Sequence, residues 1–183
     1  MIYNFSLQQV GLTVGLALLV THLIAFLQPA LTSRLLLSFP RSQLAGFALL
    51  AIAALWSAFL VQTMDLGEFS PARFPLLISV PILALLVAIF PPEFLAVRTL
   101  GTIALLAAEP VLSAAFLNPA PSRLLIVSLA YLWIFAGLFW VGIPWLLRDQ
   151  ISWLSQSLPR LRLAALAGAT YGLLLIILAA TLW

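Results

Sequence analysis

The stretch LQQVGLTVGLALLVTHLIAFLQ, residues 7–28, contains no charged side chain. Because an α-helix rises about 1.5 Å per residue, about 20 apolar residues cross the ~30 Å hydrocarbon core of a bilayer. Five later stretches share this length and apolar character: residues 43–62, 74–90, 96–117, 124–147 and 163–183. The sequence therefore predicts an all-α, polytopic integral membrane bundle of about six transmembrane helices, forming one transmembrane domain over residues 1–183.

The composition indicates that lipid, rather than water, surrounds most of the chain. Hydrophobic residues make up 64% of the chain and charged residues 7%, whereas a soluble domain carries about 25% charged residues. The basic residues are all Arg, with no Lys, and they stand mostly alone near the ends of apolar stretches. Nucleic-acid binding needs a clustered basic face. We therefore expect membrane lipids as partners and no nucleic acid.

Residue types that are absent exclude several kinds of chemistry. The chain has no Cys, which excludes disulfides, iron–sulfur clusters, thiolate zinc sites and cysteine nucleophiles. His22 is the single histidine, so one chain cannot supply two axial haem ligands or a multi-histidine metal site. We find no nucleotide-binding loop, nucleophile elbow, zinc-protease motif or paired catalytic carboxylates. The sequence predicts no enzyme and no resident cofactor, although a bound lipid, pigment or quinone remains an alternative.

The distribution of Arg predicts the orientation. Six lie in the first, third and fifth connections and two on the opposite side: Arg34, Arg41, Arg98, Arg148, Arg160 and Arg162 against Arg73 and Arg123. Basic residues favour the cytoplasmic side of a membrane. The expected location is the inner (plasma) membrane, crossed several times, with both termini on the non-cytoplasmic side.

Proline marks the ends of the predicted spans, because it lacks an amide donor and disfavours helix at the preceding residue. The breakers are Pro40, Ser70-Pro71, Pro91-Pro92 and residues 118–121. In the fifth connection, residues 148–162, the spacing of Ile151, Leu154 and Leu158 favours a short helix in the membrane interface. Trp145 and Trp153 would anchor it. The alternative is a plain connector.

Glu109 is the first candidate for function, because it lies within the predicted span 96–117. Acidic residues in spans are costly and usually face a bundle interior or a water-filled cavity, so Glu109 is expected to be protonated or paired. Pro110 follows and frees one backbone carbonyl in the preceding turn. A carboxyl beside a free carbonyl is a candidate proton or cation site. The alternative is a protonated Glu109 with one interhelical hydrogen bond.

Three other polar residues fall at a similar depth, roughly 10 Å below the outer face by the helical rise. These are Ser57, Ser79 and Tyr131, each on a different predicted span. If all face inward, they form a polar cluster with Glu109 that opens toward the periplasm. The alternative is that each hydroxyl bonds to its own helix.

His22 and Arg98 are candidate ligand contacts. His22 lies about 10 Å deeper than Glu109, with Thr170 between them in depth; the alternative role is a hydrogen bond across helices. Arg98 shares a helix face with Glu109, but roughly 16 Å along the axis separates them. An anion-binding role for Arg98 competes with insertion of its guanidinium among cytoplasmic headgroups.

Small residues and aromatic residues form two further patterns. Gly11 and Gly15, and Ala164, Gly168 and Gly172, recur every four residues, which favours close helix packing within the bundle or against a partner. Tyr131, Phe135 and Phe139 form one stripe, with Trp133 and Trp140 on another face. An aromatic stripe of this kind holds a pigment, quinone or lipid tail; the alternative is that it simply packs or faces lipid.

Three functions remain. The first is a non-catalytic accessory or scaffold subunit that packs with other membrane subunits or with itself, favoured by the short connections and the small-residue ridges. The second is a small transporter or channel that uses Glu109. The third is a pigment-, quinone- or haem-contacting subunit of an electron-transfer complex.

Overall fold

The computed structural model describes residues 3–90 and 93–183 and is all-helical, with eight α-helices in these ranges. Six stretches are long and apolar enough to cross a membrane, which confirms the predicted fold class. Five of them are single helices, and the third runs through a 3-10 helix, η2 (Gly67–Ala72), into α4. Their bounds are α1 (Leu7–Leu27), α3 (Gln43–Thr63), α4 (Arg73–Ile89), α5 (Leu95–Ala115), α6 (Arg123–Gly142) and α8 (Leu158–Thr181).

Side-chain caps fix where the first two spans begin. Ser6 Oγ accepts from the Gln9 amide at 3.1 Å, and Gln9 Oε1 accepts from the Ser6 amide at 3.1 Å. Ser42 Oγ accepts from the Ala45 amide at 3.2 Å. These bonds satisfy amide donors that the first turn of a helix leaves free.

Proline breaks the chain as expected at three of the four places. Pro40 lies in a 3-10 turn, η1 (Phe39–Arg41), Pro71 lies in η2, and residues 118–121 connect α5 to α6. The pair Pro91-Pro92 lies outside the described residues. Pro81 and Pro110 lie inside α4 and α5 and do not end them.

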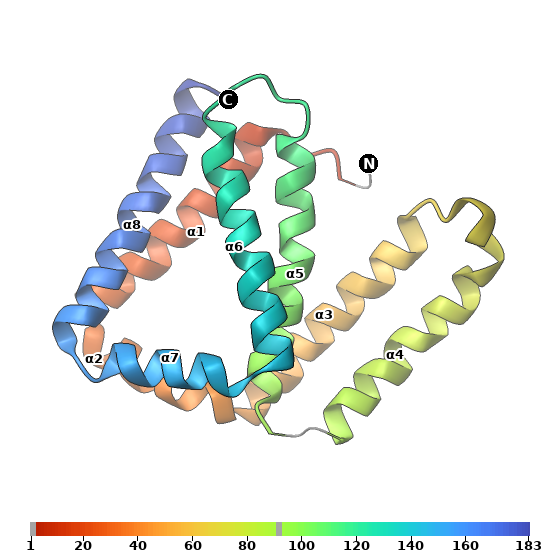
Figure 1. Cartoon of the computed structure of the whole chain (residues 1–183), viewed down its shortest axis with the longest axis horizontal. Helices are drawn as coiled ribbons and strands as arrows, with labels where there is room; N and C mark the ends of the chain where they lie inside the picture. The colour runs from red at the N-terminus through yellow and green to blue at the C-terminus, as the bar shows by residue number, and fades with distance from the viewer. Residues whose placement is uncertain (1–2, 91–92) are drawn as a thin grey trace.

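Two short helices lie at the Arg-rich end of the molecule, across the direction of the spans (Figure 1). They are α2 (Pro29–Ser38) and α7 (Trp145–Ser155), and they contact each other. The expected helix over residues 148–162 is corrected: α7 begins earlier, after Pro144, and Leu158 starts α8. Its buried face is Leu147 and Ile151. Helix α2 was not predicted from the sequence. It begins with Pro29 at its first position, where the missing amide donor costs nothing.

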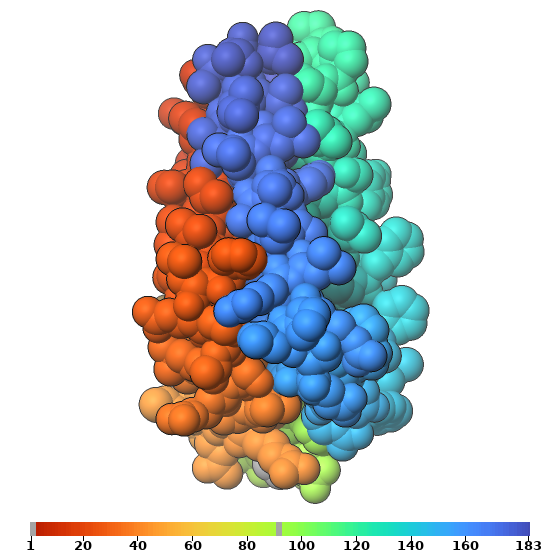
Figure 2. Space-filling model, turned by 90° about the vertical axis from the view of Figure 1, so that its left-hand side faces the viewer, coloured from red at the N-terminus to blue at the C-terminus, as the bar shows by residue number. Residues whose placement is uncertain are grey.

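The spans form a four-helix body and a two-helix arm (Figure 1). In the body, α1 packs along α8 and α5 packs along α6, and Figure 2 shows α1 and α8 side by side down one face. The arm is the hairpin α3–α4. Its α3 packs on α5, whereas α4 packs on α3 and η2. The termini lie at the end opposite α2 and α7.

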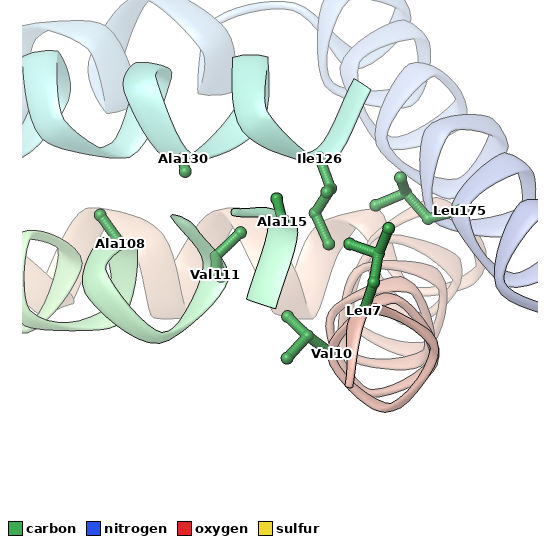
Figure 3. Packing of buried hydrophobic residues seen from close by; sticks show 8 residues of the cluster. All are labelled: Leu7, Val10, Ala108, Val111, Ala115, Ile126, Ala130 and Leu175. Carbon is green, nitrogen blue, oxygen red and sulfur yellow. The ribbon is translucent and has the colours of Figure 1, made fainter. Parts of the chain in front are cut away.

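The core joins the four helices of the body. Figure 3 shows its buried side chains converging from α1, α5, α6 and α8. Ile126 and Leu175 are completely buried at its centre. The members are Leu7, Val10, Ala108, Val111, Ala115, Ile126, Ala130 and Leu175.

Glycines let the paired helices of the body approach closely. A Cβ at Gly15 would lie 2.8 Å from the Gly172 carbonyl oxygen, and a Cβ at Gly172 would lie 2.7 Å from that of Gly15. Gly101 and Gly137 face each other in the same way between α5 and α6. The expected close packing of the small-residue ridges is confirmed within the bundle, except at Ala164, which is exposed.

Candidate functional site

Helix α5 carries the polar side chains that lie deepest in the bundle. It has the largest buried share of the six spans. Arg98 and Thr102 are one turn apart, as are Glu109 and Ser113, and a spacing of eleven residues returns to the same face of a helix. One face of α5 therefore presents a basic end on the Arg-rich side and a carboxyl nearer the other side.

Glu109 is bonded within its own helix. Its Oε1 accepts a hydrogen bond from Ser113 Oγ at 2.8 Å. Its Oε2 is buried and has no hydrogen-bond partner within the described ranges. The alternative role predicted for Glu109 was a hydrogen bond to another helix. The structure shows instead a hydrogen bond within α5. An unsatisfied buried oxygen is unusual in a folded protein, and it marks Glu109 as a group with spare capacity to accept a proton or bind a cation.

The expected polar layer of four residues is not brought together. Ser79 Oγ donates to the Leu76 carbonyl of its own helix at 2.7 Å. The Tyr131 side chain is 52% exposed. Ser57 lines a cavity with Arg98 rather than with Glu109. Among the described residues, no hydrogen bond links Glu109 to any of the other three.

A cavity of about 260 Å³ lies in the wedge between the arm and the body. We call it the wedge cavity. Its walls are mostly aliphatic, with Arg98 and the hydroxyl residues Ser57, Thr99 and Thr102 as polar members. Thr99 and Thr102 donate hydrogen bonds to backbone carbonyls of their own helix, α5. Arg98 is the charged residue in the lining of the wedge cavity. The sequence named Ser57 and Arg98 separately and did not predict that they share a cavity.

Arg98 also caps the neighbouring helix. Its Nη1 donates at 3.0 Å to the carbonyl of Val141 in the last turn of α6, where carbonyls lack intrahelical donors. Arg123, at the start of α6, donates at 3.0 Å to the carbonyl of Ala115, at the end of α5. Each helix of this antiparallel pair therefore caps the other.

His22 packs in the interface between α1 and α8. Its Nδ1 donates to the Leu18 carbonyl of its own helix at 2.8 Å. The ring lies against Gly168, where a Cβ would meet the ring carbon Cδ2. Thr170 is exposed and donates to the Ala167 carbonyl at 2.9 Å. The sequence placed Thr170 between His22 and Glu109, but within the described ranges no hydrogen bond joins these three residues.

The structure has a second cleft, of about 700 Å³, that was not predicted from the sequence. It lies between the N-terminal part of the chain and the body helices α5 and α6. Pro110, the residue that follows Glu109 in the sequence, lines this cleft. Its polar lining comes from Asn4, Gln9 and Thr13. These residues were overlooked because they precede or begin the first apolar stretch, where polar residues are ordinary.

The aromatic stripe faces away from the protein. Tyr131, Phe135 and Phe139 are all exposed, which on a spanning helix means that they face lipid or a partner. Trp133 instead packs against the core, and Trp140 Nε1 donates to Gln150 Oε1 at 3.3 Å. The stripe therefore lines no enclosed site for a pigment or quinone.

Fold and site together define a polytopic helical membrane protein with polar groups on its central helix. Over the described parts of the chain, no group of three metal-binding side chains comes together. Comparison of the chain with protein-family models, with curated proteins and with solved structures found no match.

Proposed function

We propose that this protein is a non-catalytic subunit of a larger membrane assembly, and that it contacts its partner through α4. The observation that carries the proposal is the exposure of this helix. Among the described residues, none of those in α4 is buried, and its packing neighbours are α3 and η2. Each of the other five spans has buried residues of its own.

The two long faces of α4 differ in what they meet. Val80, Ala84 and Val87 line the wedge cavity. At about 100° per residue, the opposite face carries four large exposed side chains. These are Ile78, Ile82, Leu85 and Ile89. We call them the outer α4 ridge.

Packing rather than hydrophobicity would drive this contact. Lipid tails solvate apolar side chains as well as a protein does, so helices associate in membranes mainly through shape. The outer α4 ridge follows the i, i+4, i+7 rows that interlock with the grooves of another helix. An arm held to its body through α3 also leaves this ridge clear of the other spans. Together these features support a lateral contact with another membrane subunit or with a second copy.

We further propose that the assembly lies in the inner (plasma) membrane with both termini outside the cytoplasm. Six of the eight Arg lie in α2, η1 and α7 or in the first turns of α5 and α8, all at one end of the bundle. The transverse helices α2 and α7 lie at that same end (Figure 1). The positive-inside rule favours the cytoplasm for this end.

The absence of Cys provides a direct test. Single cysteines at Leu85, on the outer α4 ridge, and at Leu138, an exposed position of α6, would be coupled to a benzophenone maleimide in native membranes and irradiated. We expect a protein adduct of fixed mass from Leu85→Cys and none from the matched control Leu138→Cys. Purified adducts would show whether the partner is another subunit or a second copy. A chain that is monomeric on native gels, with no protein adduct at Leu85, contradicts the proposal.

Glu109 supports a second candidate function, a small transporter or channel, because its buried Oε2 has no partner in the part of the chain that the structure describes. Glu109→Gln keeps the shape and the bond from Ser113 but removes the titratable group. In proteoliposomes, a Glu109-dependent carrier would lose proton or cation flux in this variant, while a Ser79→Ala control, whose hydroxyl bonds to its own helix away from Glu109, retains it. Equal flux in wild type and Glu109→Gln removes this candidate.

A further inference from the structure

Arg98 has a positive charge that the protein leaves without a counter-charge. In residues 3–90 and 93–183 the ion pair found joins Arg148 to Asp149, and Arg98 has no carboxylate within ion-pair distance. Its hydrogen-bond partner is a neutral carbonyl, and its Nε is buried without a partner in these ranges. A guanidinium has five N–H donors and is always charged. Beside an apolar cavity, such a group is costly unless an anion lies close to it.

The position of Arg98 decides which anion can reach it. Arg98 is three residues after the start of α5, so it lies only about 4.5 Å along the helix from that end. This end of the bundle carries most of the Arg residues and the transverse helices. A long Arg side chain near the end of a spanning helix can reach lipid phosphates, and anionic lipids are attracted to such basic ends.

The lining of the wedge cavity decides what lies behind the headgroup. Apart from Arg98 and the three hydroxyl residues, its walls are aliphatic side chains of α3, α4 and α6. Along α4 it runs from Val87 to Val80, about 10 Å by the helical rise. A narrow aliphatic slot of this length fits part of one acyl chain.

We propose that the wedge cavity binds an anionic glycerophospholipid, with its phosphate at Arg98 and one acyl chain between α4 and α5. The charge of Arg98 selects the headgroup, and the walls formed by Ala54, Val80, Ala84 and their neighbours receive the chain. Thr99 and Thr102 are bonded to their own helix and do not select the ligand. This inference concerns the inner side of the arm and does not depend on a partner at the outer α4 ridge.

Three variants separate the contributions. Arg98→Met removes the charge and keeps much of the volume. Ala84→Phe fills the slot and leaves Arg98 in place. Arg123→Met is the matched control, because Arg123 makes the equivalent bond to a helix end at 3.0 Å on the opposite side of the bundle.

Each protein would be reconstituted in vesicles with equal amounts of phosphatidylglycerol and phosphatidylcholine, and the lipids it retains would be measured by native mass spectrometry. We expect wild type and Arg123→Met to retain phosphatidylglycerol roughly fivefold over phosphatidylcholine, the effect of one Arg on an anionic lipid. Arg98→Met and Ala84→Phe should retain the two lipids equally. If Arg98→Met fails to fold, Ala84→Phe decides the test alone.

Three results would overturn the proposal. The first is an unchanged preference in Ala84→Phe, which shows that no chain enters the slot. The second is an equal loss in Arg123→Met, which shows a general effect of surface charge. The third is displacement of phosphatidylglycerol by millimolar inorganic phosphate, which shows a site for a free anion.

Discussion

At the contact between Gly15 and Gly172, a methyl group added to either glycine would collide with the backbone of the other helix. A Cβ on Gly15 would lie 2.8 Å from the Gly172 carbonyl oxygen, and backbone cannot rotate away as a side chain can. We expect Gly15→Ala to separate α1 from α8 and to lower the free energy of unfolding by roughly 1–3 kcal/mol, the usual cost of overpacking. Unfolding in mixed micelles would measure it.

Gly142 is the matched control for this prediction. A Cβ there would meet nothing within 4 Å, so Gly142→Ala should leave stability unchanged or raise it by up to ~1 kcal/mol through helix propensity. If the two alanine variants unfold alike, the close contact of α1 and α8 does not contribute to stability.

Single residues also show what the sequence can and cannot predict about a site. The helical rise placed Glu109, Ser57, Ser79 and Tyr131 at one depth, but depth says nothing about the direction of a side chain. In a soluble protein the alternation of polar and apolar residues reveals which side of a helix faces the core. In lipid both sides are apolar, so this signal is missing. In fact Ser79 is half-buried and bonds to its own helix, and Tyr131 is exposed.

At the scale of elements, the mutual capping of α5 and α6 makes a quantitative prediction. Hydrogen bonds from a charged donor contribute roughly 1.5–3 kcal/mol, so Arg98→Met and Arg123→Met should each lower stability by about that amount. The two caps are roughly 25 Å apart along the pair, and distant sites usually add. The double variant should therefore lose the sum of the two effects, within about 0.5 kcal/mol. Calorimetry or micelle unfolding of all four proteins checks this.

The elements themselves were predicted unevenly. Spans of about 20 apolar residues stand out because the bilayer sets their length. Helix α2 was missed because residues 29–42 lie between two predicted spans, although proline also begins helices. Helix α7 was placed too late because Leu158 continues the spacing of Ile151 and Leu154, although Pro159 already belongs to the first turn of α8.

For the whole molecule, the orientation in the membrane is a prediction that single cysteines can test. Asp65 and Gln156 are exposed in connections at opposite ends of the bundle (Figure 1). If the Arg-rich end is cytoplasmic, a membrane-impermeant maleimide should label Asp65→Cys in intact cells and Gln156→Cys only after the membrane is opened. The reverse pattern would place both termini in the cytoplasm.

The arrangement of the six spans was not predictable from their hydropathy. Gly15 and Gly172 were recognised as packing residues, but the pattern did not say whether they would meet each other or a partner. The isolation of α4 had no sequence signal, because its outer ridge of Ile and Leu has the composition of any lipid-facing helix. Which spans touch depends on the shape of their surfaces rather than on polarity.

The pairing of the first span with the last has a consequence for biosynthesis. Roughly 150 residues lie between Gly15 and Gly172, and at a synthesis rate of about 5–20 residues per second the ribosome needs roughly 8–30 s to make them. During that interval the glycine face of α1 has entered the bilayer without the surface that will cover it. Insertion of α8, rather than of any earlier segment, is thus the event that permits the body to close.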